Sequence, residues 1–509
     1  MGTLFRGGTD WTFDDLQAFD SAIAEVAHGE FGLDTYVNQI EVISTEQMLD
    51  AYASGGLPIS YPHWSKGKEF IRNEQAYRKG ARGLAYELVI NSNPCIAYLM
   101  EENSAPLQAL VIAHACYGHN AFFKGNYLFR KWTDADAIVD AMVEARRHVM
   151  ECERKYGIEA VEDVLDACHA LMDYTVERGG ARAVASRQRD AHDAERLQLR
   201  ERSAWERWDP LWSTVPHLAA GPGSGKPGVP GAPPRPPFPA EPVENLLGFV
   251  EEHAPRMDDW KRELVRIVRE LGQYFYPQTQ TKLMNEGYAT FWHYTILNRL
   301  YDKGMADDAF MLEFLHVHTN VVTQRGYDQP GYGGMNPYAL GLAIFQDIRR
   351  VCERPTAEDR EWFPQMAGTD WVSAVDFAMR NYKDESFVTQ FLSPKVIRDL
   401  RLFAVADHRA NDYLEIDAIH DESGYRRVRR LLAAQYDRDV VLPNIQVLSF
   451  DRDGDRSLVV RYTMNRMRPL NEDYKRVAQH LADLWGFRVR FEFEADEKSR
   501  FYEHFDPAR

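Results

Sequence analysis

The chain has 509 residues and a formal net charge of −17, and it contains no hydrophobic run long enough to cross a bilayer. This acidic balance argues against a dedicated nucleic-acid-binding protein, and no basic segment followed by an apolar stretch opens the chain as a secretory signal would. The five cysteines form no Cys-x-x-Cys pair, which favours a reducing compartment over a disulfide framework. We therefore expect a cytoplasmic protein of roughly two to four domains, without nucleic-acid binding or membrane insertion.

In the first part of the chain, a short β-hairpin precedes a helix that carries histidines. Two β-rich runs, residues 84–90 and 95–100, flank the turn sequence Asn91-Ser92-Asn93-Pro94, which predicts an antiparallel hairpin. Ser104 and Pro106 then have the chemistry of an N-cap and a first helical turn. A hairpin that leads into a histidine-bearing helix is an arrangement that many metallopeptidases also have, although this is an analogy at the level of the fold.

His114 and His119 lie five residues apart on this apolar helix. On an ideal α-helix that spacing separates two side chains by about 140°, so they would not share a face. A π-bulge near Gly118 would bring the two imidazoles together, and such bulges favour functional sites. Position 115 is alanine, so the general-base glutamate of the His-Glu-x-x-His signature is missing. The candidates to replace it are Glu87, Glu101, Glu102 and Glu313.

A second predicted helix, over residues 279–303, carries Glu286 and His293 seven residues apart, which places them on the same face. Gly287 costs such a helix about 1 kcal/mol relative to alanine, which indicates a close approach by another segment. The segment Asn285-Glu286-Gly287-Tyr288-Ala289 is similar to one in gluzincin aminopeptidases, in which the glutamate is a zinc ligand. The alternative is that both helices are core helices with satisfied polar groups.

The predicted metal centre therefore holds zinc or another divalent cation through His114, His119 and Glu286. His293 is either a fourth ligand or a supporting group behind the ligands. His316 and His318 follow in the next predicted helix, residues 307–322, where their alternate positions allow at most one of them to join the site.

The remaining pattern predicts an α+β protein with two domains. The first, residues 1–405, is mainly helical with a small sheet (a zincin-like arrangement if the metal centre exists), and a Gly/Pro-rich segment at 217–242 interrupts it as a disordered loop. Residues 177–208 are highly charged and read as an exposed helix. The second domain, residues 406–509, has the order β-α-β-β-α-β, which predicts a ferredoxin-like fold.

Several segments together give the chain a resemblance to the SpoVR family, the stage V sporulation protein R group, including its enterobacterial members. The resemblance spans nearly the whole length and is carried by Gln39-Ile40-Glu41-Val42-Ile43, Tyr61-Pro62-His63-Trp64, Asn91 to Pro94, His114 to Asn120, Met284 to Tyr294, Asn336 to Gly341, Lys383 to Phe387 and Gln390 to Lys395. The segment at 217–242 departs from the family pattern, which fits a tolerant loop.

The resemblance implies a part in building the spore cortex in spore formers and a role in stress or stationary-phase physiology in other bacteria. It also implies a pathway shared with a serine protein kinase and a von Willebrand-type protein. It establishes no reaction, so no catalytic residue is carried over. Two hypotheses follow: a zincin-like, metal-dependent hydrolase of peptide or amide bonds, or a non-catalytic adaptor in a serine-kinase-linked stress pathway.

Overall fold

The computed structural model describes residues 4–54, 57–78, 87–177, 238–326, 329, 333–406, 415–418, 421–437, 441–463, 473–496 and 499–507. The chain forms two compact units. The first unit comprises Met1–Asp173, Met257–Pro443 and Asn465–Asn471, and the second comprises Tyr174–Arg256, Asn444–Met464 and Glu472–Arg509. These units divide the chain at other places than the predicted boundary between residues 405 and 406. Nearly all of the predicted charged helix at 177–208 and most of the predicted loop at 217–242 lie outside the described residues.

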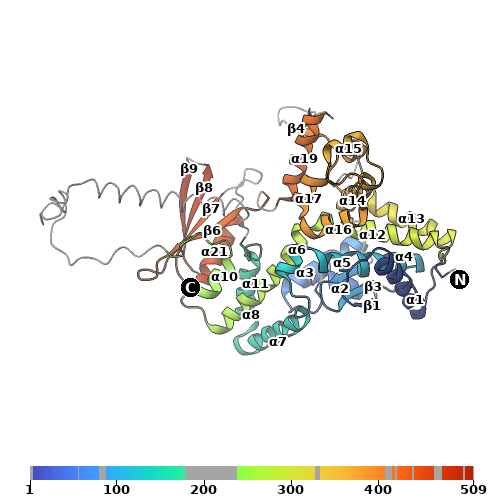
Figure 1. Ribbon diagram of the computed structural model, residues 1–509. Coiled ribbons are helices and arrows are strands. Elements are labelled where there is room, and N and C mark those ends of the chain that lie inside the picture. The colour runs from blue at the N-terminus through green and yellow to red at the C-terminus, as the bar shows by residue number, and fades with distance from the viewer. Residues whose placement is uncertain are drawn as a thin grey trace, which may run out of the picture. The chain divides into compact units, whose positions relative to one another are not determined.

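The first unit is mainly helical (Figure 1). Its helices before residue 173 are α1 Phe13–Ala24, η1 Glu25–Glu30, α2 Thr45–Ala53, α3 Trp64–Arg78, α4 Ala105–Val111, η2 Ile112–His119, α5 Asn120–Gly125, α6 Tyr127–Trp132, α7 Ile138–Tyr156 and α8 Ile158–Ala170. Those after residue 257 are α11 Asp259–Gln280, α12 Lys282–Asp302, α13 Asp308–Val322, α14 Pro337–Glu353, α15 Ala357–Trp362, α16 Trp371–Asn381, α17 Asp384–Phe391, α18 Pro394–Asp399 and α19 Glu422–Tyr436. Within the described part of the chain, no helix combines the length and apolar character needed to span a membrane.

The predicted start of α4 is confirmed. Ser104 is the N-cap of α4 with Pro106 in the first turn, and the Ser104 hydroxyl donates to Glu313 on α13. Asn336 caps α14 by accepting the backbone N–H of Tyr338. The Asn336 cap satisfies a backbone N–H group that a helix leaves free at its first turn. The Ser104 side chain makes no such bond to the backbone of α4.

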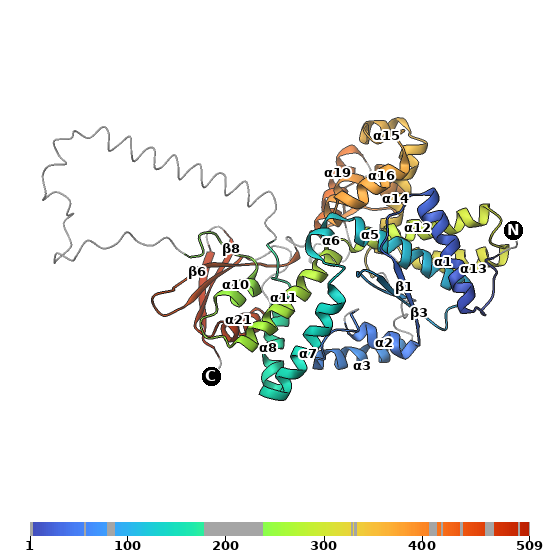
Figure 2. The same ribbon diagram turned by 60° about the horizontal axis from the view of Figure 1, so that its bottom comes forward.

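A three-stranded sheet lies beside α2 and α3 (Figure 2). Its strands are β1 Asn38–Ile43, β2 Glu87–Ile90 and β3 Cys95–Met100, in the order β1-β3-β2. β2 and β3 form the predicted antiparallel hairpin, and β1 pairs in parallel with β3. In this register Glu87 lies opposite Leu99, so the two side chains share one face of the sheet. Leu99 is buried in the main core, and that face therefore points toward η2.

α12 is the centre of the helical core, in contact with η2 on one side and α14 on another. Two very close backbone approaches allow α12 to pack against both helices. A Cβ on Gly118 of η2 would lie 2.5 Å from the Cα of Ala289 on α12, and a Cβ on Gly287 of α12 would lie 2.4 Å from the Cα of Gly341 on α14. Only glycine fits such crossings without a shift of the backbone. The close approach predicted at Gly287 is confirmed.

The second unit contains α10 Leu246–His253, α21 Asp473–Trp485 and a four-stranded sheet of β6 Asn444–Phe450, β7 Leu458–Thr463, β8 Val489–Asp496 and β9 Ser499–Phe505. The strand order is β6-β7-β8-β9, with β7 and β8 parallel and the outer pairs antiparallel. Trp485 is completely buried between rings of this unit, with its ring centroid 4.9 Å from Phe450 and 5.9 Å from Phe249.

The predicted ferredoxin-like arrangement of residues 406–509 differs from this topology. β5 Glu415–Ala418 pairs with β4 Ala404–Ala406 in a separate two-stranded sheet of the first unit, and the sheet of the second unit is completed by β9, which was not predicted. The strands and helices of the prediction exist in the predicted order. Alternation of side chains identifies a strand but does not identify the strand with which it pairs, which explains the wrong topology.

Candidate metal centre

The local geometry of η2 brings the two histidines of the sequence together. The segment is a π-helix, and the backbone N–H of Asn120 bonds to the carbonyl of Ala115, five residues earlier. In such a helix residues five apart lie nearly above one another, unlike in an α-helix. The rings of His114 and His119 accordingly meet edge to face with centroids 4.6 Å apart. The predicted π-bulge near Gly118 is confirmed.

Glu286 reaches the two imidazoles from α12. The Gly118–Ala289 contact holds the two helix backbones close enough for a glutamate side chain to span the gap. The Glu286 Oε2 atom lies 3.5 Å from Nε2 of His119 and 3.8 Å from Nε2 of His114. Asn285, the residue before it, bonds through Oδ1 to Nδ1 of His119 at 2.9 Å. That bond puts the His119 proton on Nδ1 and leaves the Nε2 lone pair facing Glu286.

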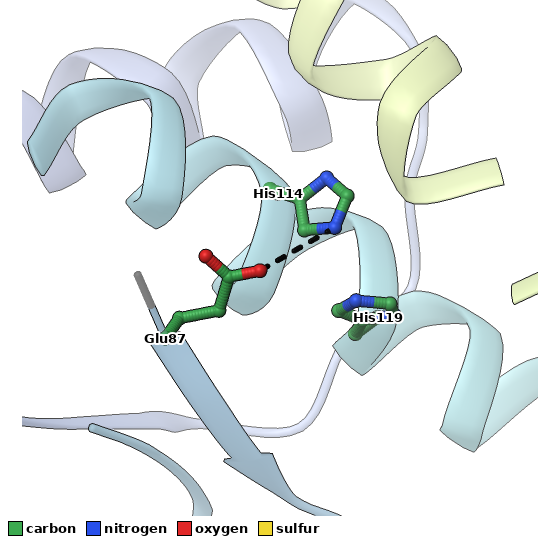
Figure 3. A group of neighbouring side chains, drawn as sticks. All are labelled: Glu87, His114 and His119. Atoms are coloured by element: carbon green, nitrogen blue, oxygen red, sulfur yellow. Dashed lines mark ion pairs between the residues drawn. The ribbon is translucent and has the colours of Figure 1, made fainter. Parts of the chain in front are cut away.

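Glu87 reaches His114 from the start of strand β2. Its Oε1 atom lies 3.6 Å from Nε2 of His114. One donor atom from each of Glu87, His114 and His119 falls within 4.8 Å of the others. Figure 3 shows the Glu87 carboxylate extending from the strand toward His114, with His119 one turn further along the helix. The sequence offered Glu87 only as one of four general-base candidates.

The other three glutamates lie away from this cluster. Glu101 and Glu102 are exposed, and Glu102 accepts a hydrogen bond from Thr45 at 2.6 Å. Glu313 accepts from Ser104. Tyr338, at the start of α14, completes the surroundings: its ring stacks 6.4 Å from that of His114, and its hydroxyl contributes to lowering the pKa of Glu286.

His293 lies behind His114 and does not face the carboxylates. Its Nδ1 atom is 2.9 Å from Nδ1 of His114, on the side of the ring away from Glu87 and Glu286. Its Nε2 atom is 2.9 Å from Nδ1 of His318 on α13. His316 is exposed and contacts Asn320. Of the two positions predicted for His293, the geometry corresponds to the supporting one.

Two atoms at the centre of the cluster lack a hydrogen-bond partner although they are buried: Nε2 of His114 and Oε2 of Glu286. Their separation of 3.8 Å is too long for a hydrogen bond. Zinc with four ligands at about 2.0–2.1 Å in a tetrahedron separates neighbouring ligand atoms by about 3.3–3.4 Å. The observed separations of 3.5, 3.6 and 3.8 Å are close to that value. Nitrogen and carboxylate oxygen donors also suit zinc, so the donor set fits such an ion.

The electrostatics of the cluster are those of coupled acid and base groups. Burial lowers the pKa of His114, but Glu286 and Glu87 outweigh it, so the pKa lies above its ordinary value. Burial raises the pKa of Glu286, but the His114 and His119 imidazoles outweigh it and the pKa is lowered. Burial, with the Glu286 charge adding to it, raises the pKa of Glu87 against the effect of His114. Burial and the nearby His114 lower the pKa of His119 to about 4. His119 is therefore neutral at physiological pH, and its Nε2 atom has a lone pair that a metal ion can bind.

The described residues thus define a mainly helical α+β protein in which two buried imidazoles meet two half-buried carboxylates. The family described as SpoVR like protein matches residues 10–441, and the SpoVR-like C-terminal domain matches residues 443–496. The chain belongs to the SpoVR family, as its motifs predicted.

One relative is YcgB of Escherichia coli (strain K12), which is described as an uncharacterized protein. It is 53% identical to this chain over 497 residues, which cover 98% of this chain and 95% of YcgB. No solved structure matches the chain.

Proposed function

We propose that this SpoVR-family protein is a metalloprotein that holds zinc or another divalent cation in the cluster of Glu87, His114, His119 and Glu286. The observation that carries the proposal is the pair of buried, partnerless atoms, His114 Nε2 and Glu286 Oε2, which face the same point. Burying such groups without a partner costs free energy, on the order of 1–3 kcal/mol each. A cation between them would remove that cost and balance the two carboxylate charges.

We further propose that the centre serves hydrolysis of a peptide or amide bond. A bound zinc ion would polarise a carbonyl group and acidify a water molecule. His114, His119 and Glu286 supply three protein donors, the number that leaves a catalytic zinc site open. The arrangement of two histidines on one helix and a glutamate on a second, beside a small sheet, is similar to that of gluzincins.

Glu87 is the residue that we assign as the proton acceptor of this reaction. Oε2 of Glu286 lies within 4 Å of Nε2 of both imidazoles, whereas the carboxylate of Glu87 forms its ion pair with His114, so Glu286 is the better placed ligand. Burial raises the pKa of Glu87, and a raised pKa brings a carboxylate closer to the value that suits a general base near neutral pH. If Glu87 were instead a fourth ligand, the site would be closed and structural.

The first test measures metal in protein purified without a histidine tag. We expect about one divalent ion per wild-type chain and less than about 0.2 in Glu286→Gln, because one of three ligands is lost. Glu102→Gln, an exposed glutamate of the same part of the chain, is the matched control and should keep the wild-type content. A wild-type content as low as that of Glu286→Gln would end the proposal.

The second test separates an open site from a closed one. If Glu87 is the proton acceptor, the Glu87→Gln variant should keep its zinc. Its kcat for cleavage of an amide substrate should fall by about 100-fold or more. If Glu87 is a ligand, the same variant loses zinc. That second result would remove the hydrolase assignment and leave a structural metal site.

A further inference from the structure

Three buried imidazoles from three different helices form a continuous hydrogen-bonded row. His114 on η2 bonds through Nδ1 to Nδ1 of His293 on α12, and His293 bonds through Nε2 to Nδ1 of His318 on α13, with both distances 2.9 Å. The exposed fractions are 3%, 1% and 6% in that order. Aromatic rings enclose the far end, since His318 lies 4.9 Å from Tyr294 and 5.8 Å from Phe314 between ring centroids.

While all three rings are neutral, the hydrogen bonds of the row can run in only two directions. Each neutral imidazole has one N–H and one lone pair, so the assignment at one ring fixes the next. In one direction His114 donates from Nδ1 to His293, and His293 donates from Nε2 to His318. His114 then has its lone pair on Nε2, toward Glu87 and Glu286. In the opposite direction His114 carries a proton on Nε2 and cannot be a ligand there.

We infer that His293 and His318 are positioning residues that select the metal-binding tautomer of His114. The inference rests on the proposed metal centre and extends it to α13. His119 obtains the same fixation directly, from the amide oxygen of Asn285. His114 has an imidazole as its acceptor, and an imidazole accepts at Nδ1 only when its own proton is on Nε2. His318 keeps that proton on Nε2 of His293 because its own Nδ1 accepts the hydrogen bond. His318 therefore acts on His114 through His293.

The test compares zinc affinity by chelator competition in three variants of the full chain. His318→Leu removes the acceptor, and we expect a loss of affinity of about tenfold or more. His318→Asn places an amide oxygen close to the position of Nδ1, and it should recover most of the affinity. His316→Leu is the matched control on the same helix, because His316 is exposed and outside the row. It should bind zinc as the wild type does.

The second readout is the tautomer itself, observed by NMR of zinc-loaded wild-type protein with ¹⁵N-labelled histidine. We expect His293 protonated on Nε2 and His318 unprotonated on Nδ1. A proton on Nδ1 of His318, or equal zinc affinity of His318→Leu and the wild type, would overturn the inference and leave the metal centre standing. A wild type that binds no zinc would overturn the proposed function, and the inference with it. The NMR result also decides the matter if His318→Leu does not fold.

Discussion

Asp384 shows how one residue fixes the start of the helix that carries Glu286. Its carboxylate oxygens accept the backbone N–H groups of Leu283 and Met284, both at 2.8 Å, and so bind the first turn of α12. The side chain is buried, and burial raises its pKa to about 7 although these two bonds oppose the shift. An aspartate in the unfolded chain has a pKa of about 3.9.

We predict a stability that depends on pH through Asp384. The folded chain keeps the Asp384 proton between about pH 4 and pH 7 while the unfolded chain has lost it, so this contribution to stability is complete below about pH 4 and is lost as the pH rises through 7. Asp384→Asn cannot titrate. Relative to the wild type, its free energy of unfolding should therefore rise from pH 4 to pH 8, by about 4 kcal/mol at most. Urea denaturation at several pH values measures this.

Asp370→Asn is the control and should show the opposite sign. Asp370 caps α16 by accepting the N–H of Ser373 at 2.8 Å. Hydrogen bonding from the Ser373 side chain, together with this backbone bond, lowers the pKa of Asp370. Its contribution is therefore present above the unfolded pKa and is lost as the pH falls through the folded one. Equal pH profiles for wild type and Asp384→Asn would contradict the assignment of a protonated, buried carboxyl group.

At the same scale, the sequence singled out three of the four side chains that the structure brings together in this cluster. His114, His119 and Glu286 could be found because their spacing can be compared with helical periodicity, and Gly118 marked the place where the period changes. Glu87 could not be selected from four glutamates, because its direction depends on the register that pairs it with Leu99. A one-residue slip of that register would turn Glu87 to the other face.

At the scale of helices, the packing around α12 depends on glycine. Gly287 meets Gly341 of α14 so closely that an added Cβ would lie 2.4 Å from backbone. Gly67 of α3 has nothing within 4 Å of an added Cβ. Substitution by alanine can therefore be compared at a tightly packed glycine, Gly287, and at an open one, Gly67.

We predict opposite effects of alanine at these two positions. Gly287→Ala should lower the free energy of unfolding by roughly 1–3 kcal/mol, because the helices must separate. It should also weaken zinc binding, because Glu286 is the adjacent residue. Gly67→Ala should raise stability by about 0.5–1 kcal/mol through helix propensity alone. Thermal denaturation and the zinc affinity of both variants measure this, and a Gly287→Ala protein as stable as Gly67→Ala would contradict the packing.

Sequence patterns predicted which segments are helix or strand better than they predicted the strand pairing. The β2–β3 hairpin was found because Asn91 to Pro94 is a turn sequence between two β-rich runs. The parallel pairing of β1 with β3 brings together segments separated by α2 and α3, and no local signal specifies it. The same limitation explains why β5 was assigned to the wrong sheet.

At the scale of the whole molecule, the two units have separate sets of buried side chains. Among the residues that the structure describes, the main core around α12 contains none from the second unit. The second unit buries its own set, of which Trp485 is the largest fully buried side chain. Each unit therefore has the apolar interior that cooperative unfolding requires.

We predict two thermal transitions in calorimetry. Zinc at 100 times its dissociation constant should stabilise only the first unit, by about 2.7 kcal/mol. Trp485→Ala should destabilise only the second, by roughly 3–5 kcal/mol. Glu286→Gln is the control, because adding zinc to this variant should shift neither transition. One transition that responds to both changes would contradict independent units.

The distance along the chain between the donors has a consequence for synthesis on the ribosome. His119 and its partner Asn285 are separated by 166 positions. At about 5–20 residues per second, α12 emerges on the order of ten to thirty seconds after η2. During that interval the nascent polypeptide carries Glu87 and both imidazoles without Glu286. In the proposed metal centre, an ion bound during that interval would lack Glu286 as a ligand until α12 has been translated.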